Sequence, residues 1–233
     1  MNYKLAFELE GKKHLIGDCE AQTRSGSIFA GAEIKYIKND NAINIKDKVA
    51  ILLNDDVLFT GFAHFVACLV GKITVGLVEG TEEFHTKKIM SDFSFRKEKA
   101  KNILNEILDI AKIEDKNIDF ADEEIERFSL YNVTIEHALL TLKEVIKLYT
   151  NEEIMIFFDR ENKFNFIEKS KFKQKEVFEF NYGENIISLD KYLKVEPKNI
   201  RSDEKIKIDG EEKRITQTIL TIRDGNGVMN IYY

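Results

Sequence analysis

The side chains best suited to metal binding or acid–base catalysis are few and scattered along this sequence of 233 residues. None of the histidines or cysteines forms an HxH, HExxH or CxxC pattern, the spacings that bring metal ligands or redox thiols together on one local element. The sequence therefore predicts no metal site and no cofactor. The residues concerned are His14, His64, His85, His137, Cys19 and Cys68.

Four of these side chains have a plain structural interpretation. His64 alternates with apolar residues, as in a strand that carries an ordinary core or surface histidine. His137 falls in the first turn of a predicted helix, and His85 follows two glutamates, with which it could form a loop salt bridge. Cys68 stands between an alanine and a leucine and is expected to be a small buried thiol rather than a nucleophile.

Carboxylates are plentiful, but no pair is spaced for hydrolysis. Asp159 and Glu161 share one predicted turn and Asp55 and Asp56 share another, whereas the two carboxylates of a glycosidase face each other from separate elements. The sequence also lacks GxSxG, Walker and GxGxxG patterns, since 76–80 holds only two glycines around a strand end. Catalytic, cofactor-binding and metal-binding residues are all predicted to be absent, which favours a binding or structural protein over an enzyme.

The first third of the chain predicts antiparallel β structure. Alternating apolar residues around an acidic turn at 54–56 indicate a hairpin, and Gly61 inside its second strand is typical of a bulge or a sharp bend. A partly closed barrel or sandwich over 1–80 is the expected module. Its predicted strands are 3–9, 28–37, 49–53, 57–65 and 73–77.

Helical periodicity replaces alternation in the middle third. Apolar residues at steps of three and four predict helices over 98–112 and 135–149, and Asn132 or Thr134 is the expected N-cap of the second. The acidic stretch 119–127 between them is predicted to be a solvated connector.

Strands are predicted again after the second helix. Two aromatic runs around the turn 159–162 predict a β-hairpin, which completes a helical insert at 81–168. The remaining residues predict a second β module with a tight turn at 224–227. The expected fold class is α+β, with two small antiparallel β-barrel modules, 1–80 and 169–233, flanking a helical insert with a β-hairpin. The predicted strands are 154–158, 163–167, 186–193, 205–208, 214–223 and 228–233.

A similar phrase occurs in both β modules. An alternating strand, a tight acidic turn, and a second strand that begins with an apolar residue and threonine occur at 47–60 and again at 204–216. Because acidic turns between β-rich runs are common, the match indicates either two related modules or chance. Two related modules in one chain would suggest assembly rather than chemistry.

Charge and composition argue against several classes of function. The net charge of −6 is concentrated in 81–168, which carries −7, whereas 1–80 carries −1 and 169–233 carries +2. No region has the basic excess that phosphate neutralisation requires, so sequence-specific nucleic-acid binding is not expected. The sequence has no membrane-length apolar run, no apolar N-terminal signal and two cysteines, which indicates a protein of the reducing cytoplasm without a membrane span.

Three motifs, in this order, resemble those of the baseplate hub proteins of phage tails. They are a hairpin of the form V-x-I-x-x-x-D-x-x-x-F-x-G, a helix of the form T-x-x-x-A-L-x-x-L, and an aromatic hairpin turn of the form F-D-R-E-G, where this chain has asparagine at the last position. That group is similar to the late control D proteins and to the hub portion of type VI secretion spike proteins. The matching residues are Val49, Ile51, Asp55, Phe59 and Gly61; Thr134, Ala138, Leu139 and Leu142; and Phe158, Asp159, Arg160, Glu161 and Asn162.

The resemblance implies a structural role in a phage tail or tail-like baseplate. A homotrimer with two β modules per chain would form a pseudo-sixfold ring between the tail tube, or a tube-initiator protein, and a threefold spike, with 81–168 on the outer rim. Many relatives continue into a spike, whereas this sequence ends at Tyr233, so the spike is expected to be a separate protein. The implied location is the virion or tail-like particle, assembled in the bacterial host cytoplasm.

Two alternatives remain open. One is an adaptor module of another secretion or tail-like machine. The other is a cell-wall-directed carbohydrate-active enzyme, which would need two carboxylates from different elements in one cleft.

Overall fold

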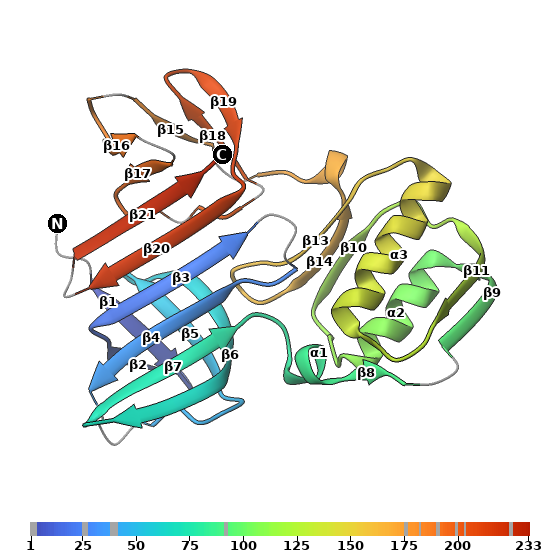
Figure 1. Cartoon of the computed structure of the whole chain (residues 1–233), viewed down its shortest axis with the longest axis horizontal. Helices are drawn as coiled ribbons and strands as arrows, with labels where there is room; N and C mark the ends of the chain where they lie inside the picture. Colours follow the sequence, from blue (N-terminus) through green and yellow to red (C-terminus); the bar gives the residue numbers. More distant parts are fainter. Residues whose placement is uncertain are drawn as a thin grey trace. The chain divides into compact units, whose positions relative to one another are not determined.

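The chain folds as two compact units, which the computed structural model describes over most of their length (Figure 1). The β unit comprises Met1–Glu79 and Lys173–Tyr233, and the insert unit comprises Gly80–Phe172. Tyr3 of the first predicted strand and Asp224 and Gly225 of the predicted C-terminal turn lie outside the described residues. The described residues are 4–24, 28–37, 42–90, 93–174, 177–181, 183–189, 192–198, 200–202, 204–223 and 226–233.

The β unit contains one large antiparallel sheet to which the first and last thirds of the chain both contribute. Its strand order is β16-β17-β21-β20-β3-β4-β7-β6-β5-β1-β2. β20 and β3 pair along their whole length, from Gln217 opposite Arg24 to Arg223 opposite Asp18, and this ladder joins the two thirds. The strands are β1 (Leu5–Leu9), β2 (Lys12–Leu15), β3 (Asp18–Arg24), β4 (Gly31–Ile37), β5 (Lys48–Leu53), β6 (Asp56–Leu69), β7 (Lys72–Val78), β16 (Ile186–Leu189), β17 (Leu193–Val195), β20 (Gln217–Arg223) and β21 (Asn226–Tyr232).

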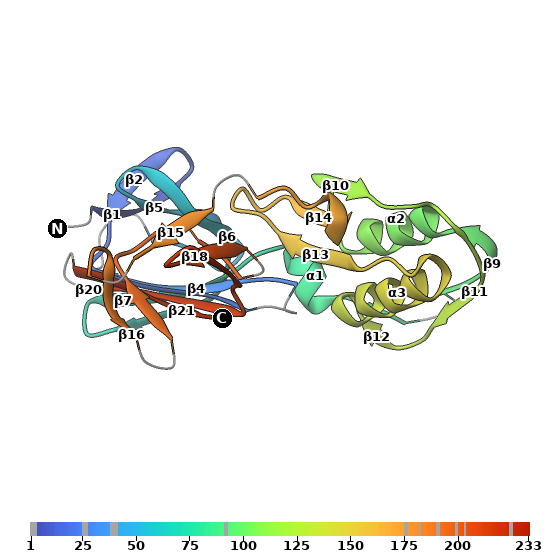
Figure 2. The ribbon, with the colours of Figure 1, turned by 90° about the horizontal axis from the view of Figure 1, so that it is seen from above.

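Buried side chains from both ends of this sheet meet in one hydrophobic core. In Figure 2, β1, β2 and β5 lie on the opposite side of the β unit from β4, β20 and β21, and apolar residues of both sides belong to the same core cluster. A small sheet of β15 (Phe178–Phe180), β18 (Lys205–Ile208) and β19 (Glu211–Arg214) adds Phe180, Ile206 and Ile208 to that core. Each fully buried side chain of this size contributes about 1.5–3 kcal/mol, so this burial is the main stabilising term of the unit.

The predicted β-rich α+β class is confirmed, but two separate closed barrels are not. No sheet formed by the described residues closes on itself, and strands of both terminal thirds share the large sheet. The reason lies in β3 and β20, whose alternating residues bury Cys19, Leu220 and Ile222 on one common face when the two strands pair. The assignment of 1–80 and 169–233 to separate modules stays a prediction.

The last third contains more turns than the sequence analysis predicts. The predicted strand 214–223 is interrupted, since β19 ends at Arg214 and β20 begins at Gln217. The predicted strand 186–193 consists of two strands, β16 and β17. β19 was missed because it has no apolar residue, and its pairing with β18 includes the exposed 2.6 Å ion pair between Lys205 and Glu212.

β6 is long because it pairs with β5 through its first half and with β7 through its second. Gly61 lies where a Cβ atom would be only 2.4 Å from the carbonyl oxygen of Val78, so a close backbone approach requires glycine there. The register does not shift at Gly61 itself: it shifts between Val57 and Phe59 opposite β5, and between Ala63 and Phe65 opposite β7.

The insert unit contains three helices in its described part, and two of them are those predicted from periodicity. α3 begins after Thr134, whose side-chain oxygen accepts a 3.2 Å hydrogen bond from the backbone N–H of His137, so Thr134 rather than Asn132 is the N-cap. The predicted aromatic hairpin is β13 and β14. The elements are α1 (Glu82–Thr86), β8 (Lys88–Ile89), β9 (Phe93–Lys99), α2 (Ala100–Ile110), β10 (Lys116–Asp119), β11 (Glu124–Leu130), β12 (Val133–Thr134), α3 (Ile135–Thr150), β13 (Ile154–Phe158), β14 (Phe164–Glu168) and a 3-10 turn (Lys169–Lys171).

The prediction of a solvated connector at 119–127 is wrong. β11 begins at Glu124 and pairs with β9, and both Phe120 and Ile125 are buried. The buried residues of β11, Ile125, Phe128 and Leu130, are not regularly spaced among its polar residues, so the sequence shows no strand alternation there. Among the described residues, no helix has the length and apolar character needed to span a bilayer.

Candidate functional site

The histidines do not assemble into a site. His14 packs its ring against Phe7 with a centroid distance of 4.9 Å, and the imidazole of exposed His64 lies over Gly76. His137 is exposed on α3, and His85 packs against Phe84 within α1 at 5.0 Å. In the part of the chain that the structure describes, no three His, Cys, Asp or Glu side chains are grouped to hold a metal ion.

The two cysteines lie in opposite environments. Cys19 is buried in β3, and this burial raises the pKa of its thiol to about 12. Cys68 is exposed, so the prediction of a buried thiol is wrong. The reason is that Cys68 lies in the second half of β6, beyond the last residue that pairs with β5.

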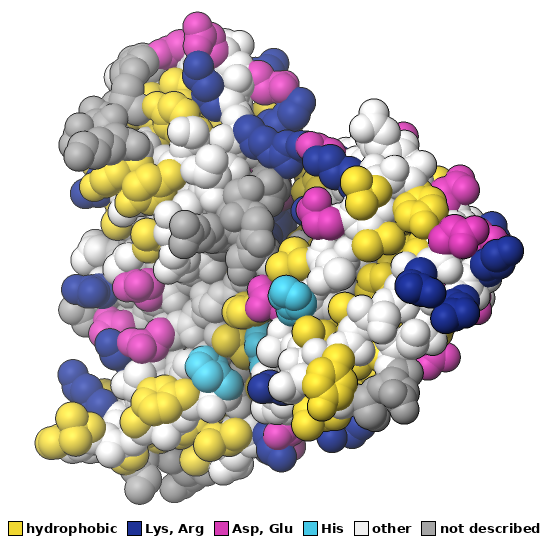
Figure 3. Space-filling view, turned by 45° about the vertical axis from the view of Figure 1, so that its right-hand side comes forward, with side chains coloured by type: hydrophobic (Ala, Val, Ile, Leu, Met, Phe, Trp, Pro, Cys, Tyr) yellow, Lys and Arg dark blue, Asp and Glu magenta, His cyan; other side chains and the backbone are white. Residues whose placement is uncertain are grey.

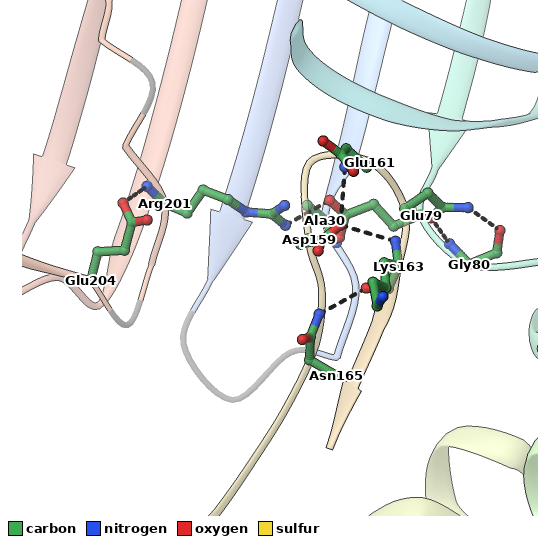
Figure 4. Close-up of polar contacts among 10 residues, drawn as sticks. Ala30, Glu79, Gly80, Asp159, Glu161, Lys163, Asn165, Arg201 and Glu204 are labelled. Carbon is green, nitrogen blue, oxygen red and sulfur yellow. Dashed lines mark hydrogen bonds and ion pairs between the residues drawn. The ribbon is translucent and has the colours of Figure 1, made fainter. Parts of the chain in front are cut away.

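In each predicted pair of turn carboxylates, one member makes a structural contact. In β13–β14, Oδ1 of Asp159 accepts hydrogen bonds from the backbone N–H groups of Glu161 and Lys163, each at 3.0 Å (Figure 4). In β5–β6, Asp55 accepts a 2.8 Å hydrogen bond from Lys13, which holds the pKa of that carboxyl below its usual value. The structure therefore gives neither pair the arrangement of a hydrolase.

A buried ion pair in the β unit is the polar feature that sequence reasoning missed. Oε1 of Glu79 lies 2.6 Å from Nη2 of Arg201, and the side chain of Glu79 is completely buried while that of Arg201 is 17% exposed (Figure 4). Oε2 of Glu79 also accepts a 2.8 Å hydrogen bond from the backbone N–H of Ala30. The only signal in the sequence is a single acidic residue at the end of the apolar run of β7, and nothing in it identifies Arg201 as the partner.

A second polar arrangement, within the insert unit, fixes Gly80 to the turn of the aromatic hairpin. The backbone N–H of Gly80 donates to Oδ1 of Asn162 at 2.6 Å, and Nδ2 of Asn162 donates to the carbonyl of Gly80 at 2.9 Å. Asn162 has φ 64°, the left-handed conformation that asparagine tolerates in place of the glycine usual in the hub motif. This match makes Asn162 a structural residue of the turn.

Several large apolar side chains are exposed on the described surface. Figure 3 shows acidic and basic side chains interspersed with hydrophobic ones on the face it presents. In the β unit, the most exposed large apolar residues lie at the end of the β6–β7 hairpin and beside it: Val70 is 96% exposed, Leu69 77% and Ile37 76%. Exposed apolar groups of this kind suit a protein contact better than they suit catalysis.

Comparison with known proteins identifies the fold. No protein-family model and no curated protein matches the sequence. The prophage MuSo2 43 kDa tail protein from Shewanella oneidensis matches with a TM-score of 0.74 and 9% identity, over 98% of this chain and 95% of that one. A tail protein from Neisseria meningitidis MC58 matches with a TM-score of 0.72 and 7% identity, over 99% and 96% of the two chains.

A third solved structure extends the likeness beyond phage. The E. coli c3393 protein, described as a component of the type VI secretion system with structural similarity to the T4 tail proteins gp27 and gp5, matches with a TM-score of 0.64 and 12% identity. That alignment covers 97% of this chain and 76% of the other. At these identities the likeness concerns the fold, and this chain has the fold of phage tail proteins over nearly its whole length.

Proposed function

We propose that this chain is a structural hub protein of a phage tail or tail-like baseplate, in which three copies form a ring that joins the tail tube to a separate central spike. The observation that carries the proposal is the fold shared with two phage tail proteins along almost the full length of both partners. The order of the three sequence motifs favours a hub within that class. The particle, assembled in a bacterial cytoplasm, would be the site of action.

Two hairpins support the idea of two related β modules, 1–80 and 169–233. The repeated phrase folds as β5–β6 in the first copy and as β18–β19 in the second. Both have a two-residue turn with positive φ angles, 52° and 72° at Asn54 and Asp55, and 47° and 84° at Asp209 and Gly210; this is the common geometry of such turns and also occurs between β1 and β2 and between β6 and β7. Three chains with two such modules each would present six similar elements to a sixfold tube and a threefold axis to a spike.

A structural role also fits the chemistry of the described residues. In the two pairs of turn carboxylates, Asp159 accepts hydrogen bonds within its own turn and Asp55 forms an ion pair with the exposed Lys13. The outer position of the insert 81–168 belongs to the same proposal, since its charge of −7 is most stable in water.

The test is the mass of the chain alone and its assembly with tube protein. Light scattering is expected to give three times the chain mass of 27.0 kDa. Electron microscopy is expected to show rings on the ends of tubes after addition of the tube protein encoded beside this chain. A stable monomer at high concentration, with no ring on adding tube protein, would contradict the proposal.

A second candidate is an adaptor module of another secretion machine. The match to the c3393 protein favours it, because that protein is described as a type VI secretion component. An adaptor would be a monomer or a heterodimer without tube contact, so the same measurements separate the two candidates.

A further inference from the structure

A closed ring of three copies needs two different contact surfaces on every chain. A contact between two identical surfaces joins a pair and stops, whereas a head-to-tail contact between different surfaces can close a trimer. Open strand edges are natural surfaces for such contacts, because their backbone N–H and C=O groups can pair with another chain.

The outer side of β6 is one such edge. The last contacts of β6 on its β5 side are made by Ala63, which donates to the carbonyl of Asp47 at 2.9 Å and accepts from Lys46 at 2.7 Å. From Phe65 to Leu69, the described residues supply a ladder partner only on the β7 side. We call this stretch the β6 edge. It contains no charged residue and no proline, although these are the usual protection of open edges.

The turn at the end of the β6–β7 hairpin, next to the β6 edge, holds Val70 in an unfavourable conformation. We call this turn the hairpin end. Val70 has φ 49° and is 96% exposed, although a β-branched residue is disfavoured in this conformation and an apolar one is disfavoured in water. Asparagine would suit this turn better. Leu69 and Ile37 lie in one row across the sheet on either side of Lys72, which extends the exposed apolar surface. Strain together with exposure indicates a contact made in an assembly.

Among the described strands of the β unit, the second uncharged edge is β16, the terminal strand of the large sheet. Its sequence is Ile-Ile-Ser-Leu, and Ile187 is 54% exposed. The terminal strand at the opposite end, β2, carries Lys12 and Lys13, and β19 of the small sheet consists of two glutamates, a lysine and an arginine. Charge thus protects β2 and β19 against pairing but leaves the β6 edge and β16 open.

We propose that, in the trimer proposed above, the β6 edge of one copy pairs with β16 of the next copy. The partner is therefore a second copy of this chain, and the contact is head-to-tail. Pairing would satisfy the open backbone groups of both edges and would cover Phe65, Leu69, Val70 and Ile187. Because each copy offers one β6 edge and one β16, three such contacts close a ring in which both of these edges are paired in every copy.

Cross-linking between cysteines tests the pairing directly. Cys68 already lies in the β6 edge and is exposed, and Ile187→Cys adds a thiol to β16. Cys19 is buried and does not interfere. A short bismaleimide is expected to convert the Ile187→Cys protein into covalent dimers and trimers, and to leave both the wild type and the double variant Cys68→Ser/Ile187→Cys as single chains.

The matched control introduces a cysteine on the charged edge. Leu15 of β2 is 70% exposed, so Leu15→Cys offers an equally accessible thiol and is expected to give no link to Cys68. Links in the wild type would mean that β6 pairs with itself, and links in the Leu15→Cys protein would mean that β2 is the partner edge. Either result overturns the proposal. If the protein has a trimeric mass but Cys68 does not link to a cysteine at 187, the proposed strand pairing is wrong and the hub proposal is unaffected. If the wild type is a monomer, both proposals are wrong.

A substitution at the turn separates assembly from folding. Val70→Asn relieves the backbone strain of the turn, so the melting temperature of the monomer is expected to stay equal or rise. The same substitution is expected to raise the trimer dissociation constant by at least ~10-fold, which corresponds to about 1.4 kcal/mol. Leu15→Lys on β2 is expected to leave that constant unchanged. An unchanged dissociation constant in Val70→Asn would overturn the role of the hairpin end.

Discussion

The buried ion pair of the β unit provides the sharpest test of the structure. Arg201→Met removes the cation but keeps a side chain of similar length, so it leaves the carboxylate of Glu79 buried without its charge partner. Glu79→Gln is the complementary change, since an amide oxygen can still accept the 2.8 Å hydrogen bond from Ala30. The two single variants and their combination form a double-mutant cycle.

The expected magnitudes differ because the two side chains are buried to different degrees. Glu79 is completely buried, and breaking a buried pair by removing one partner costs about 3–5 kcal/mol, which is expected for Arg201→Met. Arg201 is 17% exposed and can move its guanidinium toward water, so Glu79→Gln is expected to cost less, about 1–3 kcal/mol. The double variant buries no net charge and is expected to be more stable than Arg201→Met alone.

The measurement should report on the β unit alone, because two units can unfold separately. Cys19 is a suitable probe: it is buried in that unit and becomes reactive only when the unit opens. In a Cys68→Ser background, maleimide labelling at increasing urea gives the unfolding midpoint. With a urea m-value of ~1–3 kcal/mol per M, a loss of about 3 kcal/mol moves that midpoint down by about 1–3 M.

A matched control uses an ion pair of similar length that is exposed. Lys205 and Glu212 are 2.6 Å apart with side chains 55% and 51% exposed, so Glu212→Gln is expected to cost less than about 1 kcal/mol. The reasoning would be refuted if Arg201→Met cost no more than this control. It would also be refuted if the effects of Arg201→Met and Glu79→Gln were simply additive.

Four further results are expected. Gly61→Ala should destabilise the β unit by about 1–3 kcal/mol in urea unfolding, because its Cβ would overlap the carbonyl of the facing strand. Cys68 should react fully with maleimide at pH 7 in the native protein while Cys19 stays unlabelled, as intact mass spectrometry would show. Thr134→Ala should destabilise the insert unit by about 1 kcal/mol through loss of the helix cap, read by circular dichroism. Asp55→Asn should lower stability at pH 7 but not at pH 2: the folded pKa of Asp55 is depressed, so its stabilisation exists above the unfolded pKa of about 4 and is lost as the pH falls.

Each of these changes has a control of similar chemistry. Gly31→Ala places its Cβ 3.7 Å from the nearest carbonyl oxygen and should be nearly neutral. Asn132→Gly keeps the positive φ of that residue without removing a cap, so equal losses in Asn132→Gly and Thr134→Ala would contradict the assignment of the N-cap. Equal labelling of both cysteines would contradict the burial of Cys19. A constant difference between Asp55→Asn and the wild type from pH 7 to pH 2 would contradict the pairing of Asp55 with Lys13.

The sequence predicts those elements whose signal is local. α2 and α3 are found because their apolar residues recur at helical spacing, and the β5–β6 and β13–β14 hairpins are found because turn residues separate alternating runs. β19 is missed because it has no apolar residue, and β11 is misassigned because its buried residues are not regularly spaced among its polar ones. Cys68 is misjudged because its burial depends on where β5 stops, which its neighbours in sequence do not reveal.

Features that join distant parts of the chain are the ones that sequence reasoning cannot supply. The pairing of β3 with β20 and that of Glu79 with Arg201 both connect the first third with the last. β3 and β20 both alternate buried and more exposed residues, and this pattern does not specify which strand each one pairs with. Two separate barrels and one shared sheet are therefore equally compatible with the sequence, and only the long-range register distinguishes them.

The buried ion pair is better explained as a selector of that register than as a source of stability. An apolar pair of the same volume would stabilise the unit at least as well, because the desolvation penalty of two buried charges offsets most of their electrostatic attraction. A one-residue slip between β3 and β20 would turn Cys19, Leu220 and Ile222 toward the opposite face of the sheet. Any packing that also separated Arg201 from Glu79 would bury that carboxylate without its arginine, at a cost of about 3–5 kcal/mol. Apolar burial and the ion pair thus penalise wrong pairings of the two chain ends independently, and their combination favours one arrangement of a sheet whose strands come from both sides of an insert.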